Sequence, residues 1–204
     1  MEEFGKLEER VVLVGVQTDD HDNVEESLDE LKELASTAGA VTVGRIIQNR
    51  ESVHPGTYIG KGKIEEVRAL VYAMDATGII CDDELSPAQL NNLERELDCK
   101  VMDRTLLILD IFAARAITSE GKIQVELAQL RYRSARLVGL RESLSRLGGG
   151  IGTRGPGEKK LETDRRLIRN RISALKQELS QVEKHRELTR PRRAVGNLKT
   201  AAIV

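Results

Sequence analysis

Two glycine-rich segments of the chain contain the residue types of phosphate-binding loops. Gly148–Lys160 reads GGGIGTRGPGEKK, and Gly60–Lys63 reads GKGK. Glycine lets a backbone approach a phosphate closely, and a helix N-terminus supplies N–H donors to it. In the longer segment Gly152 and Gly157 have P-loop spacing, but Glu158 stands where the lysine of a P-loop is required. The longer segment is therefore not a Walker-type loop.

The shorter segment precedes a predicted helix, so its backbone N–H groups and lysines could hold a phosphate. It lacks the GxxxxGK[ST] spacing, and no GxGxxG follows the first predicted strand. Two interpretations stay open, an ATP-binding site and a plain strand-to-helix turn. The candidate nucleotide-binding residues are Gly60, Lys61, Gly62 and Lys63.

Other reactive residue types do not form a recognisable site. Asp82, Asp83 and Glu84 follow a predicted strand and could bind Mg²⁺, although such a cluster is more often a solvated loop. The three histidines are far apart in sequence, and Cys81 and Cys99 form no CxxC pair. We predict no catalytic residue and no metal site in this chain.

The composition bounds the class of protein. A chain of 204 residues suits one or two domains. Aromatic residues make up only 2%, which argues against a stacking platform for single-stranded nucleic acid. No apolar run approaches the roughly 20 residues of a membrane-spanning helix, and the acidic N-terminus lacks a signal-peptide pattern. We expect a cytoplasmic protein without membrane insertion.

Charge divides the chain into two parts. Residues 1–115 contain 12 Lys and Arg against 24 Asp and Glu, whereas residues 116–193 contain 19 against 9. Such an asymmetry indicates two modules, of which the basic one meets a polyanion. A solvated helical face rich in arginine is the alternative explanation.

The first part has the pattern of an α/β domain. Short apolar runs alternate with amphipathic segments, as in a small parallel sheet covered by helices. Ser86-Pro87 is a helix start, and Gly39 is a helix stop. We place this domain at residues 1–103, with strands at Val11–Val16, Ala40–Gln48, Gly78–Cys81 and Cys99–Asp103.

Residues 104–193 have a helical period, and we predict a long antiparallel coiled-coil hairpin after the α/β domain. The second predicted helix covers Thr118–Leu147, and the third begins at Leu161, follows a heptad stripe and ends near Arg190-Pro191. At about 1.5 Å per residue the arm would be ~45 Å long. The helix before the hairpin is expected to bury Leu106, Leu109, Ile111 and Phe112.

Positive charge gathers toward the tip of this predicted arm. Arg131–Arg171 contains 12 Lys and Arg against four acidic residues, which is the electrostatic pattern of a surface that binds a phosphate backbone. The glycines of the tip would allow close approach to folded RNA, and a flexible turn is the alternative explanation of this segment. The candidate RNA-binding residues are Arg131, Arg133, Arg136, Arg141, Arg146, Gly149, Gly150, Gly152, Arg154, Gly155, Gly157, Lys159, Lys160, Arg165, Arg166 and Arg169.

Four segments resemble the HflX family of ribosome-associated GTPases. They read YIGKGKIEEV, DDELSPAQLNNLE, DRTLLILDIFAARAITSEGKIQVELAQL and GGGIGTRGPGEKKLETDRRLIRNRI. The resemblance implies an α/β subdomain, a helical hairpin and a following Ras-like GTP-binding domain. It also implies association with the large ribosomal subunit and its RNA, splitting of stalled ribosomes, and a hairpin tip near the peptidyl transferase centre.

The resemblance further implies that residues 194–204 are a linker and the first strand of the GTP-binding domain, with its P-loop expected next. GTP and Mg²⁺ would then belong to that domain, and we expect no GTP hydrolysis from these 204 residues. ATP at the first subdomain stays possible, since nucleotide binding there is attributed to the family. A hairpin that pairs with helices of another protein is a third hypothesis, and the oligomeric state is open.

Overall fold

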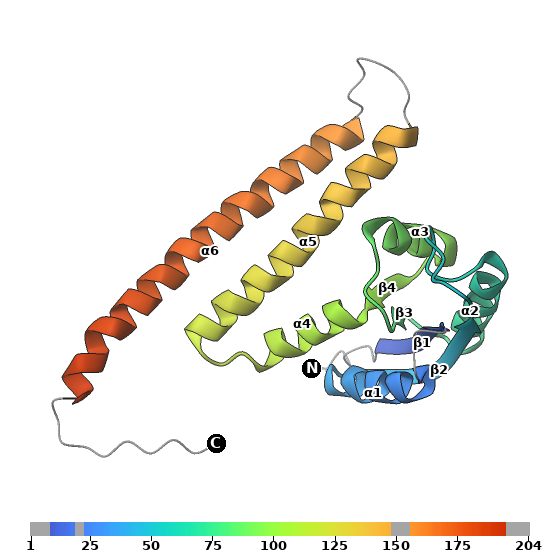
Figure 1. The fold of residues 1–204 in the computed structure, drawn as a ribbon, viewed down its shortest axis with the longest axis horizontal. Coiled ribbons are helices and arrows are strands. Elements are labelled where there is room, and N and C mark those ends of the chain that lie inside the picture. Colours follow the sequence, from blue (N-terminus) through green and yellow to red (C-terminus); the bar gives the residue numbers. More distant parts are fainter. Residues whose placement is uncertain (1–8, 19–22, 148–155, 195–204) are drawn as a thin grey trace, which may run out of the picture.

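A four-stranded parallel sheet organises the first half of the chain (Figure 1). The computed structural model describes residues 9–18, 23–147 and 156–194, and within 137–147, 156–161 and 189–194 it describes the backbone alone. The strand order is β2-β1-β3-β4. The strands are β1 (Glu9–Gln17), β2 (Ala40–Asn49), β3 (Gly78–Cys81) and β4 (Lys100–Asp103). The predicted small parallel sheet is confirmed.

Helices cover both faces of this sheet, because successive side chains of a buried strand point to opposite sides. Val12, Val14 and Val16 of β1 lie in a core with residues of α2 (Lys61–Ala73) and α3 (Pro87–Leu97). The alternate β1 residues pack in a second core against α1 (Val24–Thr37) and α4 (Arg104–Arg115). The first half of the chain is therefore a three-layer α/β sandwich, with helices on both faces of the sheet.

Local signals start and stop these helices as expected. Ser86 forms a capping box with Gln89 at the start of α3, and Pro87 occupies the first helical position. Gly39 follows α1 with a φ of +87°, a conformation that glycine adopts at little cost. Asp103 ends β4 and caps α4, since its side chain accepts a hydrogen bond from the Leu106 N–H.

Of the four residues predicted to be buried in the helix before the hairpin, only Ile111 is buried, and Leu106 and Leu109 are half-buried. Leu107 and Ile111 are the buried residues of α4, whereas Phe112 is 56% exposed. Residues four apart share a helix face, and the neighbour of a buried residue is rotated by about 100° away from it. Phe112 therefore leaves the face that packs on the sheet.

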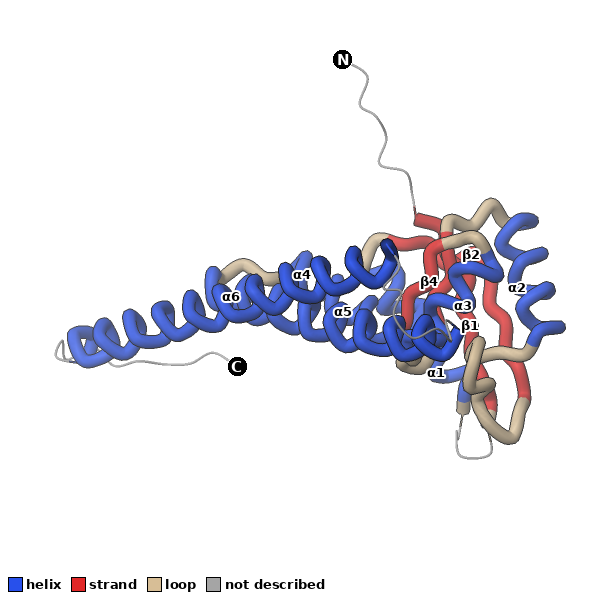
Figure 2. Tube along the Cα trace, turned by 90° about the horizontal axis from the view of Figure 1, so that it is seen from above, coloured by secondary structure: helices blue, strands red, loops and turns tan. Residues whose placement is uncertain are grey.

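Two long helices follow α4 and lie side by side in both views (Figures 1 and 2). They are α5 (Ser119–Leu147) and α6 (Pro156–Ala194). Ile123, Leu127 and Leu175 are buried between them, with further leucines, isoleucine and valine packed alongside. None of the described helices is both long and apolar enough to cross a membrane.

The bounds of α6 differ from the expectation. The helix begins at Pro156 rather than Leu161, because proline is well suited to the first turn of a helix. It also continues through Pro191 to Ala194. Proline inside a helix removes one backbone hydrogen bond and disfavours the helical conformation of the residue before it, and here the helix continues for only three residues beyond Pro191.

Candidate nucleic-acid interface

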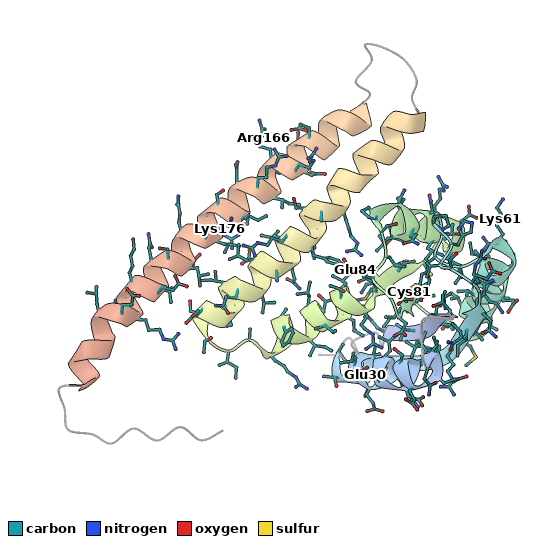
Figure 3. All side chains as sticks on the ribbon, viewed as in Figure 1. Glu30, Lys61, Cys81, Glu84, Arg166 and Lys176 are labelled. Atoms are coloured by element: carbon teal, nitrogen blue, oxygen red, sulfur yellow. The ribbon has the colours of Figure 1, made fainter. Side chains whose placement is uncertain are left out.

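Exposed arginines lie on both helices of the arm formed by α5 and α6. Arg131 and Arg133 of α5 are exposed, and so are Arg166 and Arg169 of α6. Figure 3 labels Arg166, whose side chain lies near the start of α6. The guanidinium group presents several donors that match phosphate oxygens. These four residues, which we call the arm arginines, are exposed positive charges that a phosphate backbone could contact.

Several predicted contact residues have no described side chain. Arg141 and Arg146 lie in α5, and Gly157, Lys159 and Lys160 lie in α6, all within stretches described by backbone alone. The remaining predicted tip residues lie outside the described residues; they are Gly149, Gly150, Gly152, Arg154 and Gly155.

Two predicted contact residues are largely buried. The Arg136 side chain is only 13% exposed and pairs with the buried carboxylate of Asp103. The Arg165 side chain is also 13% exposed, and its Nη1 lies 3.9 Å from the Glu162 carboxylate. Arg136 is thus a structural residue rather than a phosphate ligand, and a count of positive charge along the chain could not show this.

Other arginines of the arm join its two helices. Arg171 of α6 donates hydrogen bonds of 2.7 and 3.0 Å to the Glu126 carboxylate of α5. Arg186 lies 2.5 Å from Glu120, near the start of α5. These pairs link earlier α5 residues to later α6 residues, as expected for a hairpin.

Asp103 is the centre of a buried polar cluster where the arm meets the sheet. Its carboxylate is fully buried and accepts hydrogen bonds from the backbone N–H of Leu85 (3.0 Å) and Leu106 (2.9 Å). The Tyr132 hydroxyl and the Arg136 guanidinium of α5 also donate to it. The sequence analysis missed this cluster, although an aspartate directly before an apolar helical run is a usual N-cap signal.

The acidic segment that follows β3 is also used internally. Asp82 is buried and lies 2.6 Å from Arg104, and Arg104 also contacts Glu30 and Ser27 of α1. Asp83 accepts a 2.7 Å hydrogen bond from the Tyr58 hydroxyl. Within the described part of the chain, no three His, Cys, Asp or Glu side chains are grouped as a metal site requires.

Tyr58 is held tightly in the loop before α2. It is buried at 1% exposure with a φ of +66°, an uncommon conformation for a bulky residue. Burial, together with the nearby Cys81 and Asp83, raises the pKa of its hydroxyl, so Tyr58 is neutral and donates to Asp83. Gln89 and Asn92 of α3 donate to the carbonyls of His54 and Gly56 in the same loop.

The predicted phosphate-binding turn lies at the start of α2. Gly60 is the N-cap, and its N–H donates a 2.8 Å hydrogen bond to Gln48 Oε1. A Cβ at Gly60 would lie 2.8 Å from Arg50 Nη1, so a larger residue there would require the end of the flexible Arg50 side chain to move. Lys63 pairs with Glu66 at 2.6 Å, and Lys61 is exposed (Figure 3). The geometry explains this turn structurally without a bound nucleotide.

Two models of known protein families match consecutive regions of this chain. A model of the GTP-binding GTPase N-terminal region matches residues 25–113, and a model of the GTP-binding GTPase middle region matches residues 115–193. A GTPase HflX of Lacrimispora saccharolytica is 68% identical over 202 residues. The chain belongs to the HflX family. The boundary between the two matched regions falls at the end of α4.

The curated HflX relatives are about twice as long as this chain. The L. saccharolytica match covers 99% of this chain and 48% of the relative. The GTPase HflX of Escherichia coli is 49% identical over 197 residues, covering 96% of this chain and 46% of the relative. The chain thus contains the N-terminal and middle regions of an HflX-family protein.

Two solved structures share the fold. A GTP-binding protein of Sulfolobus solfataricus, determined with GDP, is 22% identical with a TM-score of 0.60, covering 86% of this chain and 46% of that chain. A structure of SsGBP with GDP is 23% identical with a TM-score of 0.64, covering 88% of this chain and 45% of that chain. These likenesses support the arrangement of the sheet and the helices.

Proposed function

We propose that this chain is the ribosome-binding part of an HflX-type GTPase. The arm of α5 and α6 contacts ribosomal RNA of the large subunit, and the glycine-rich segment between the helices approaches the peptidyl transferase centre. The cellular role is to split or rescue stalled ribosomes in the cytoplasm. The family membership supports the class of protein, and the surface of the arm supports the partner.

The single observation that carries the RNA contact is the exposure of the arm arginines. They lie on the two long helices of the arm (Figure 1), and each side chain is accessible to a partner. In contrast, the arginines closest to acidic residues pair within the molecule, as Arg136 and Arg171 do. Exposed guanidinium groups in a basic segment are suited to a phosphate backbone.

We also infer that α5 and α6 form an antiparallel coiled coil. The apolar residues of α6 that face α5 are spaced by three and four residues, and the burial of Leu175 fits this stripe. A supercoiled pair of helices is stiff enough to hold a basic surface away from the sheet.

GTP and Mg²⁺ binding are assigned to the GTP-binding region of the full-length relatives. The family descriptions name GTP, and the S. solfataricus structure contains GDP. No observation favours ATP at the Gly60–Lys63 turn, where Lys63 is paired with Glu66. We therefore do not extend the proposal to ATP.

The proposal is tested by removing the four arm charges. A variant with Arg131→Gln, Arg133→Gln, Arg166→Gln and Arg169→Gln should co-sediment more weakly with large ribosomal subunits at moderate salt. Each lost phosphate contact should also reduce the slope of log affinity against log salt by about one.

A matched control removes four exposed positive charges outside the arm: Lys32→Gln, Arg95→Gln, Lys100→Gln and Arg115→Gln. This control should bind nearly as well as the parent. Equal binding by the arm variant and the parent would overturn the proposed RNA surface.

A further inference from the structure

We infer that Asp103, Tyr132 and Arg136 are positioning residues that fix the direction of the arm relative to the sheet. Asp103 is the last residue of β4, and the other two residues belong to α5. The consequence for RNA binding rests on the proposed function, because the direction of the arm decides where its arginines lie. We call the contact of Asp103 with Tyr132 and Arg136 the joint, and its effect on the direction of the arm can be tested without a ribosome.

The carboxylate of Asp103 connects three separate parts of the molecule. It caps α4 through Leu106, holds the segment before α3 through the Leu85 N–H, and accepts both donors from α5. With no exposed surface, Asp103 obtains all of its described hydrogen bonds from protein donors. A small tilt of α5 would break bonds that water cannot replace, so the cluster favours one direction of the arm.

Arg136 is itself constrained from several sides. Its guanidinium carbon lies 3.6 Å from the centre of the Tyr132 ring, and it donates a 2.9 Å hydrogen bond to the Leu85 carbonyl. Arginine stacks on an aromatic face and donates in a fixed planar geometry, which lysine does not reproduce. Buried ion pairs contribute little net stability, and their best-supported role is to specify one arrangement among several.

A second contact reinforces the direction set by Asp103. Gln129 of α5 donates a 3.0 Å hydrogen bond to Asp110 of α4, on the stretch of α5 that precedes Tyr132. Two separated attachments on one helix define its direction better than one. The backbone of α5 continues for eleven residues past Arg136, to Leu147. This is about 16 Å of helix, so a tilt of about 10° at the joint would displace its end by about 3 Å.

The test measures the distance distribution between two spin labels across the joint. One label replaces Tyr72 of α2, which is 90% exposed, and the other replaces the exposed Lys176 of α6 (Figure 3), both as cysteines. Cys99→Ser removes the half-buried native thiol, and the buried Cys81 is left in place.

In this background, Arg136→Met and, separately, Tyr132→Phe should broaden the distance distribution by about twofold. Arg136→Met should also lower the midpoint of thermal unfolding, because the buried Asp103 carboxylate then lacks its cation, whereas Tyr132→Phe should retain the cooperative unfolding of the sheet. The control Arg133→Met removes an exposed arginine of the same helix and should leave the distribution narrow. A second label pair within the arm, at Arg131 and Lys176, should be unchanged in all variants.

Distributions as narrow as the parent's in both Arg136→Met and Tyr132→Phe would overturn the inference. So would broadening of the pair within the arm by the same amount, since the substitutions would then have loosened the arm rather than its joint. Unchanged ribosome binding by the arm variant would overturn the proposed RNA surface and leave this result unaffected.

Discussion

Single side chains at the carboxyl edge of the sheet do structural work that their types alone do not reveal. Asp82 and Asp83, which together resemble a metal-binding pair, instead accept from Arg104 and Tyr58. Asp103 accepts from four donors of three elements. Polar residues that follow parallel strands are often functional, and here they assemble the molecule.

The two cysteines give a residue-level prediction. Burial, with the nearby Asp103 and Asp83, raises the pKa of the Cys81 thiol, and partial burial, with Asp98 and Glu94, raises that of Cys99. Because the thiolate is the reactive form, both thiols should react more slowly than free cysteine near neutral pH. A thiol reagent should modify Cys99 slowly, at a rate that increases with pH, and should not modify Cys81 in the folded chain.

The urea-unfolded chain is the control, in which both thiols should react at similar rates. A Cys81 that reacts at the rate of a free thiol in the folded chain would contradict the described burial.

At the scale of elements, α5 and α6 depend on each other. Each helix has an apolar stripe on one face, and a single helix cannot remove this stripe from water. The two stripes pack against each other at Ile123, Leu127 and Leu175. The stability of such long helices comes mainly from this packing rather than from helix propensity. The α/β sandwich has its own two cores on either side of the sheet.

Shortening the central leucine should therefore weaken the arm selectively. Leu175→Ala, at a site 1% exposed, should reduce the stability of the α5 and α6 pair by about 2 kcal/mol. Hydrogen exchange should accelerate in both helices and remain slow in the sheet. Leu167→Ala on the same helix is the control. Because Leu167 is 59% exposed, its substitution should reduce the stability of the helix pair only slightly.

At the scale of the whole molecule, charge and shape are divided between two parts. The acidic α/β sandwich and the basic arm are joined through α4 (Figure 1) and through the hydrogen bonds of Asp103 to α5. The acidic part should be repelled by RNA while the arm is attracted, so the division itself orients the molecule toward a polyanion.

This division predicts a steep salt dependence for the parent chain. If the arm neutralises about four phosphates, the affinity for large ribosomal subunits should fall with a slope of about −3 to −4 in log affinity against log salt. Affinity measured between low and moderate salt gives this slope. A partner bound through apolar helix faces would give nearly salt-independent affinity, which would favour a protein partner instead.

The sequence by itself determined the order and type of the elements. Valine-rich runs marked the strands, a serine-proline pair and a glycine marked helix ends, and leucine spacing marked the long helices. These signals are local, because they depend on the period of side chains along one segment. The parallel sheet followed from the alternation of strands and helices.

Which polar residues face inward depends on the packing of the folded chain. Arg133 and Arg136 lie three residues apart and have the same chemistry, yet one is exposed and the other pairs with a buried aspartate from β4. That difference depends on a contact across 33 residues of chain. The spacing of residues along one helix carries no information about a partner on another element, so the role of Arg136 emerges only when the chain is folded.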